Sequence, residues 1–82
     1  MKAIIHIGLK PGVLDPQGRT IARSLSHMGF DSVTKARQGK TIELDLSSED
    51  TEAAKLEVEK MCKQLLANTV IEDYQIEIVE QD

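Results

Sequence analysis

The side chains best suited to chemistry in this sequence are two histidines and one cysteine. His6, His27 and Cys62 lie far apart and lack the short spacings typical of metal ligands. The sequence places no carboxylate or nucleophile beside either histidine, and His6 belongs to an alternating stretch, which favours a position on a sheet face. Cys62 falls within the apolar stripe of a predicted helix, where packing is expected. We therefore expect no catalytic residue, metal ion or cofactor on this chain.

One short motif matches the end of a phosphate-binding loop. Gly39-Lys40-Thr41 has the right order, but the full pattern requires a glycine where Thr34 stands. The motif also falls inside a predicted hairpin, whereas a phosphate-binding loop joins a strand to a helix. None of the serines lies in a nucleophile elbow. The residues alone thus describe a small interaction domain and not an enzyme.

The stretch that organises the chain is the loop from Leu9 to Gly18, which holds both prolines. Each proline fixes φ and biases the residue before it away from helix. Asp15 followed by Pro16 is a helix-start signal, because the carboxylate accepts hydrogen bonds from first-turn amides. The pair Val13-Leu14 at the loop tip has two interpretations that the sequence leaves open: packing into the core, or a docking surface.

Length and composition restrict the class of protein. The 82 residues form one domain, 1–82, with a net charge of −4 and two aromatic side chains, Phe30 and Tyr74. Nucleic-acid binding needs basic charge or stacking platforms, and a membrane span needs about 20 apolar residues; neither is present. A core of this size gives roughly 3–5 kcal/mol, and a disulfide or metal cannot add to it. We therefore expect oligomerisation, and the lone cysteine favours the cytoplasm.

Hydrophobic periodicity predicts the elements. They are a strand from Lys2 to Leu9, a helix from Pro16 to Met28, a hairpin from Ser32 to Leu46 turning at residues 37–40, a helix from residues 47–50 to about Ala67, and a strand from Val70 to Val79. Three positions are expected in the left-handed conformation: Gly29 and Asn68 at helix ends, and Gly39 in the hairpin turn. The serines at 47 and 48 are N-cap candidates for the second helix.

The predicted order is β-α-β-β-α-β. Two β-α-β units joined by a hairpin form an α+β, ferredoxin-like two-layer sandwich. Its antiparallel sheet has two helices on one face. Right-handed crossovers would place the first and third strands in the centre. The outer sheet face mixes Ile4 and Val79 with charged residues, which suits a subunit interface.

The first helix carries a basic stripe. Arg19, Arg23 and His27 recur every four residues on the side opposite to Ile21 and Leu25. Solvation is one interpretation of this stripe. A contact surface for an acidic partner or a phosphate is the other.

Three segments of the sequence closely resemble one known family. They are residues 9–18 (LKPGVLDPQG), residues 37–44 (RQGKTIEL) and residues 61–74 (MCKQLLANTVIEDY). The resemblance is to the PurS family, the small subunits of phosphoribosylformylglycinamidine synthase, and it extends over essentially the whole chain. Many relatives carry proline where Thr69 stands, which is a minor change after a helix end.

The resemblance implies a non-catalytic subunit of a purine-biosynthesis complex. Such subunits form homodimers or homotetramers and bridge a large synthetase subunit, which binds ATP and magnesium, to a glutaminase subunit that releases ammonia. The complete enzyme converts formylglycinamide ribonucleotide, glutamine and ATP into formylglycinamidine ribonucleotide. Residues expected to face partners are those of the two most specific segments together with two arginines: Lys10, Pro11, Gly12, Val13, Leu14, Asp15, Gln17, Arg19, Arg37, Asn68, Glu72 and Asp73.

Two other function classes fit a ferredoxin-like fold. One is an amino-acid-sensing regulatory module, which would bind glutamine or glycine. The other is a small hydrolase of the acylphosphatase type, which needs an arginine in the anion-binding loop after the first strand. That loop here reads Lys10-Pro11-Gly12, so the hydrolase is the weaker of the two.

Overall fold

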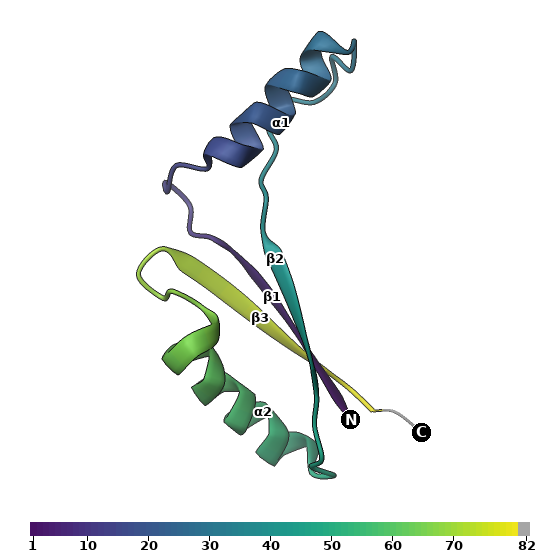
Figure 1. The fold of residues 1–82 in the computed structure, drawn as a ribbon, viewed down its shortest axis with the longest axis vertical. Helices are drawn as coiled ribbons and strands as arrows, with labels where there is room; N and C mark the ends of the chain where they lie inside the picture. The colour runs from purple at the N-terminus through teal and green to yellow at the C-terminus, as the bar shows by residue number, and fades with distance from the viewer. Residues whose placement is uncertain (81–82) are drawn as a thin grey trace.

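The computed structural model of this chain describes residues 1–80 and has the element order β-α-β-α-β (Figure 1). The elements are β1 (Lys2–Leu9), α1 (Pro16–His27), β2 (Lys40–Asp45), α2 (Thr51–Met61), the π-helical turn η1 (Cys62–Leu66) and β3 (Glu72–Val79). The predicted α+β class with an antiparallel sheet is confirmed. No helix in the described part is long and apolar enough to cross a membrane.

The sheet has the order β2-β1-β3, and both pairs of neighbours are antiparallel. Its register aligns Ile5 of β1 with Ile42 of β2 and Ile76 of β3. Because side chains alternate along a strand, every second residue of all three strands faces the same side. That side forms the core with α2 and η1. The buried apolar residues are Ala3, Ile5, Ile7, Ala54, Val58, Cys62 and Ala67.

The helix α2 begins at an aspartate and not at a serine. The Asp50 carboxylate accepts hydrogen bonds from the amides of Glu52 at 3.0 Å and Ala53 at 3.3 Å. The predicted serine caps are wrong at this position, because the Ser48 hydroxyl instead accepts a hydrogen bond from the Asp50 amide. An aspartate at the N-cap also complements the positive end of the helix dipole.

The end of this helix widens into a π-helical turn. The Ala67 amide donates to the Cys62 carbonyl at 3.0 Å, a bond that spans five residues. The predicted left-handed conformation of Asn68 is wrong, because within residues 1–80 only Gly12 and Gly29 have positive φ.

Cys62 is fully buried, as predicted. Burial raises the pKa of its thiol, and the Glu59 carboxylate adds to this effect.

The first half of the predicted hairpin is not a strand. Residues 31–39 return beside α1 and reach β2 without pairing with a strand of the described chain (Figure 1). The ferredoxin-like order of strands one, three and four is retained, so β1 is central. The open edge of β2 is where the missing strand would lie.

Gly39 does not have the predicted left-handed conformation. A Cβ at this position would lie 2.5 Å from the Ile7 carbonyl oxygen, so the close approach of the backbone explains this glycine.

Only one of the two long helices covers the sheet. The helix α2 packs on the core face, whereas α1 extends away from it (Figure 1). The prediction of two helices on one face is therefore wrong for a single chain. We call residues 10–39 the arm and the remaining described residues the body. The radius of gyration is 16.2 Å, against about 12 Å for a compact domain of this length.

The end of α1 follows the prediction closely. Gly29 has φ +94°, and the Phe30 amide donates to the Leu25 carbonyl at 3.0 Å. This is the left-handed cap that a glycine after a helix favours. Phe30 nevertheless remains exposed, because no element of the body covers this end of the arm.

Candidate partner-binding site

The carboxylate of Asp15 ties the outgoing and returning ends of the arm to each other. One oxygen, Oδ1, accepts a hydrogen bond from the Gly18 amide at 2.8 Å and caps α1, as predicted. The other, Oδ2, accepts from the Gln38 amide at 2.9 Å. Asp15 and Gln38 lie on the two connections by which the arm leaves and rejoins the body. A single side chain therefore holds both connections together.

Arg37 adds a second set of bonds across the same place. Its guanidinium Nη2 donates to the Leu9 carbonyl and, at 3.4 Å, to the Lys10 carbonyl. We call this group, Asp15 with Arg37 and the backbone that they bond, the joint. Because each connection is bonded to the other, the joint determines the direction in which α1 leaves the sheet.

The joint also determines the ionisation of Asp15. The hydrogen bond from the Gly18 amide, then that from the Gln38 amide, lowers the pKa of the carboxyl below its ordinary value of 3.8. Burial raises the pKa, but by less than either amide lowers it. The Arg37 guanidinium lowers the pKa further. The hydrogen bonds of the joint thus stabilise the ionised form of the Asp15 carboxyl.

A turn of the body lies against the start of the arm. The Lys10 amide donates to the Ile71 carbonyl at 2.8 Å. The Glu72 carboxylate closes the turn by accepting from the Asn68 amide at 2.7 Å, and its second oxygen lies 3.8 Å from Lys40 Nζ. The structure therefore brings together the two predicted partner segments, one before α1 and one before β3.

The predicted site residues fall into two groups. Asp15, Arg37 and the Asn68 and Glu72 pair hold the backbone of the joint and of the adjoining turn, as described above. The others present surface: Val13 and Lys10 are half-buried, and the exposed ones are Pro11, Gly12, Leu14, Gln17, Arg19 and Asp73. Leu14 is 63% exposed, so the loop tip does not enter the core of this chain. This favours the docking interpretation of Val13-Leu14.

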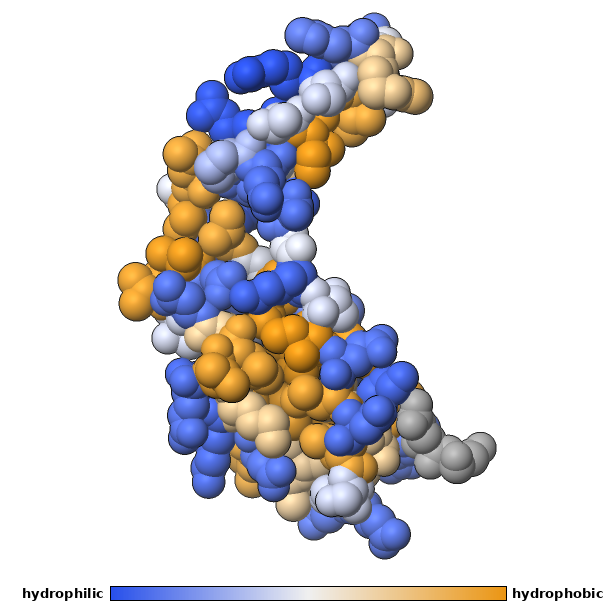
Figure 2. Space-filling model, in the orientation of Figure 1, coloured by the Kyte–Doolittle hydropathy of each residue, from blue (hydrophilic) through white to orange (hydrophobic). Residues whose placement is uncertain are grey.

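The sequence reasoning missed an apolar area beside this loop. Val70 is 80% exposed and Leu65 82% exposed. They lie on the turn before β3 and on η1, and Figure 2 shows apolar side chains along the edge where the turn adjoins the arm. The sequence predicts Val70 as the first residue of a strand, where its backbone would pair with a neighbouring strand. The signal that could have revealed it is the hydrogen-bonding capacity of Asn68, whose side chain accepts from the Val70 amide and closes a turn.

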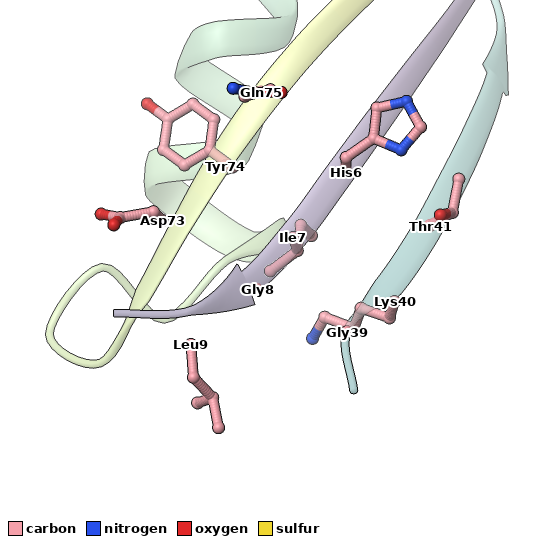
Figure 3. A pocket seen from close by; sticks show the side chains of 10 residues that line it. All are labelled: His6, Ile7, Gly8, Leu9, Gly39, Lys40, Thr41, Asp73, Tyr74 and Gln75. Carbon is pink, nitrogen blue, oxygen red and sulfur yellow. The ribbon is translucent and has the colours of Figure 1, made fainter. Parts of the chain in front are cut away.

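The outer face of the sheet has an open cleft above Gly8 (Figure 3). Its volume is about 520 Å³, and His6, Thr41 and Gln75 line it from the three strands. His6 lies on the sheet face, as predicted, but it does have a carboxylate neighbour, since Nε2 is 3.8 Å from the Glu77 carboxylate. No group of three potential metal ligands occurs within residues 1–80.

The contact between α1 and its returning segment predicts the effect of Gly18→Ala. A glycine-to-alanine change within a helix usually stabilises by roughly 0.5–1 kcal/mol. Here the new methyl would overlap the Ala36 carbonyl oxygen and lie 2.7 Å from Asp15 Oδ2, so we expect destabilisation of the arm. Limited proteolysis should cut this variant within residues 10–39 faster than the wild type. Gly8→Ala, where nothing lies within 4 Å, should be cut as slowly as the wild type.

The lowered pKa of Asp15 predicts a pH dependence of stability. A carboxyl whose folded-state pKa is depressed stabilises the fold above its ordinary value of 3.8 and loses this contribution as the pH falls through the folded-state value. Urea unfolding from pH 6 to below about 3 should therefore show a loss that Asp15→Asn lacks. Asp31→Asn on the same arm should retain the loss. Equal pH profiles for wild type and Asp15→Asn would contradict the assignment.

The comparisons with known proteins agree over the full domain. Residues 2–80 match the family PurS: Phosphoribosylformylglycinamidine (FGAM) synthase. The PurS subunit of Methanocaldococcus jannaschii is 49% identical over 77 residues, which cover 94% of this chain and 93% of that protein. The Bacillus subtilis PurS subunit is 43% identical over 79 residues, covering 96% and 93%.

Solved structures resemble the fold just described. The crystal structure of M. jannaschii PurS, named as a subunit of formylglycinamide ribonucleotide amidotransferase in the purine biosynthetic pathway, superposes with a TM-score of 0.90 at 47% identity. It covers 99% of this chain and 98% of that one. A chain of PurLQS from Thermotoga maritima gives a TM-score of 0.85 at 38% identity, with 93% of each chain covered. With sequence, fold and length in agreement, this chain belongs to the PurS family of phosphoribosylformylglycinamidine synthase subunits.

Proposed function

We propose that this chain is the non-catalytic small subunit of a phosphoribosylformylglycinamidine synthase and joins its synthetase to its glutaminase. The observation that carries the proposal is the match to PurS over residues 2–80, together with the likeness to a chain of the T. maritima PurLQS assembly. Partner contacts are made by the arm loop and the turn before β3, which lie side by side. ATP and magnesium belong to the synthetase subunit in this proposal, and the complex works in the cytoplasm.

The arrangement of side chains is consistent with a binding role. Within residues 1–80 no polar or charged residue is buried, whereas catalytic groups are usually held in partly desolvated sites. The exposed large apolar side chains instead lie on the arm, on α2 and η1, and on the turn before β3. Exposed apolar residues that form a contiguous patch mark sites of protein association. The chain then acts by holding the synthetase and glutaminase subunits in a geometry that aids the transfer of ammonia.

The chain acts as a homodimer in this proposal, because the arm has an extended segment without a strand partner and the body has an unpaired strand edge. Residues 31–39 have no strand partner, and the outer edge of β2 is unpaired within the described chain. An unpaired edge is a template for a strand from another chain. The arm of a second copy supplies a strand of the right kind for the missing place in the ferredoxin-like sheet.

The helix α1 has a matching apolar surface. Met28 is 70% exposed and Phe30 53% exposed, although both continue the apolar stripe of Ile21. On the body, Ile42 and Leu44 of β2 are only partly buried, since α2 packs mainly on β3. Figure 2 shows apolar surface on the arm and again over the body. Exchange of arms between two copies would cover both surfaces and restore two helices on one sheet face.

Amidation assays test the proposed coupling. We expect glutamine-dependent formation of formylglycinamidine ribonucleotide by the cognate synthetase and glutaminase to require this chain, and ammonium-dependent formation to require it much less. The reason is that free ammonium needs no assembled complex. Unchanged rates with both nitrogen sources on omission of the chain would exclude the coupling role.

Replacement of the exposed arm side chains tests the homodimer. Met28→Ser with Phe30→Ser should convert a wild-type dimer into a monomer at micromolar concentration in light scattering, because these side chains bury apolar area only in the dimer. Leu65→Ser, also exposed but on η1, is the matched control and should stay dimeric. A monomeric wild type, or a double variant that remains a dimer, would count against exchange of the arms.

A further inference from the structure

The side of α1 opposite to its apolar stripe carries basic residues and no acidic one. Arg19, Arg23 and His27 recur every four residues, which places their side chains in a row on one helix face. All three are exposed, and α1 contains no acidic residue. A helix that needed this face only for solubility could carry both signs of charge.

Two more cations extend this row beyond the helix. Lys35 and Arg37 come from the segment that returns beside α1, and with Arg19 and Leu14 they line a cleft of about 310 Å³. A shallower groove of about 240 Å³ joins Arg19 and Arg23, again beside Leu14. The exposed Leu14 thus lies among four basic side chains. We call Arg19, Arg23, Lys35, Arg37 and Leu14 the basic face.

No salt bridge within residues 1–80 uses a charge of the basic face, although the Arg37 guanidinium is near enough to Asp15 to lower the pKa of that carboxyl. The ion pairs in this range involve Lys2, His6, Lys40 and Lys63. The one carboxylate in the cleft, Asp15, accepts hydrogen bonds from backbone amides. In the sequence, the arm holds five basic and two acidic residues, a formal charge of +3, while the rest of the chain has five and twelve, a charge of −7.

We infer that the basic face docks a carboxylate-rich segment of a partner subunit, with an apolar side chain of that segment set against Leu14. This inference rests on the proposed function and names the chemistry of the contact. An apolar centre surrounded by charged groups is the usual anatomy of a protein interface. A row of cations spaced along a helix fits carboxylates that are themselves spaced along a chain.

Two other occupants fit the geometry less well. In the proposed dimer a second copy meets the apolar stripe of α1 and pairs with residues 31–39, whereas Arg19 and Arg23 lie on the opposite side of the helix. A small phosphate ligand needs several donors that converge on one point, whereas here both clefts are open and no polar side chain within residues 1–80 is buried. Arg19, Arg23 and Leu14 of the basic face therefore remain available to a heterologous protein after the dimer has formed.

The experiment reverses two charges of the basic face and measures binding to the purified cognate synthetase and glutaminase subunits. We expect Arg19→Glu with Arg23→Glu to weaken binding roughly tenfold or more at about 50 mM salt, and the difference to shrink at about 500 mM salt, because salt screens exposed charges. Leu14→Ser should weaken binding equally at both salt concentrations. Light scattering should find both variants dimeric.

The matched control is Lys55→Glu with Lys60→Glu, which makes the same change of net charge on the exposed side of α2. It should bind the partner subunits as the wild type does. Wild-type affinity in the Arg19 and Arg23 variant would overturn the inference, as would loss of its dimer, or displacement of the partner by inorganic phosphate but not by chloride at equal ionic strength. A wild type that binds neither subunit would instead contradict the proposed function itself.

Discussion

The rest of this structure depends on the hydrogen bonds of one carboxylate. Asp15 accepts from the Gly18 amide on the outgoing connection of the arm and from the Gln38 amide on the returning one. Arg37 reinforces the same crossing through the Leu9 carbonyl. Since α1 makes few contacts with the sheet, these polar bonds, and not apolar packing, decide where the helix stands. Charge-assisted hydrogen bonds suit this role because they are directional.

The position of the arm has a consequence for the core. With α1 away from the sheet, seven apolar residues of the described range 1–80 are buried and others remain partly covered. A core of this size gives a small margin of stability for a chain of this length. The same geometry leaves the outer edges of β2 and β3 and one helix stripe without a partner inside the described chain. In the proposed dimer, association of two copies contributes to the stability of the fold. The dimer contact uses the apolar side of α1, and Arg19 and Arg23 of the basic face lie on the other side.

Much of the fold and part of the site were predictable because they rest on local chemistry. Alternation in β1, the proline and aspartate at the start of α1, and the glycine after its end each specify backbone conformation within a few residues. The strand predicted at 32–36 was wrong for the opposite reason. Alternation shows that a segment suits a sheet, but a strand exists only where another strand lies beside it. Gly39 was misassigned likewise, because the distant Ile7 carbonyl limits the space beside it. Asn68 was misassigned for a local reason, since its side chain and backbone close a turn with Val70 and Glu72.

The sequence by itself determined the antiparallel α+β elements, the apolar stripe of each helix, the family and the excess of basic residues in the arm. Only the tertiary structure decided that α1 leaves the sheet and that Leu14 stands exposed among basic side chains. It also decided that the loop before α1 lies against the turn before β3. The physical reason is that periodicity and capping act over a few residues. The joint depends on hydrogen bonds between groups more than twenty residues apart, which no local pattern encodes.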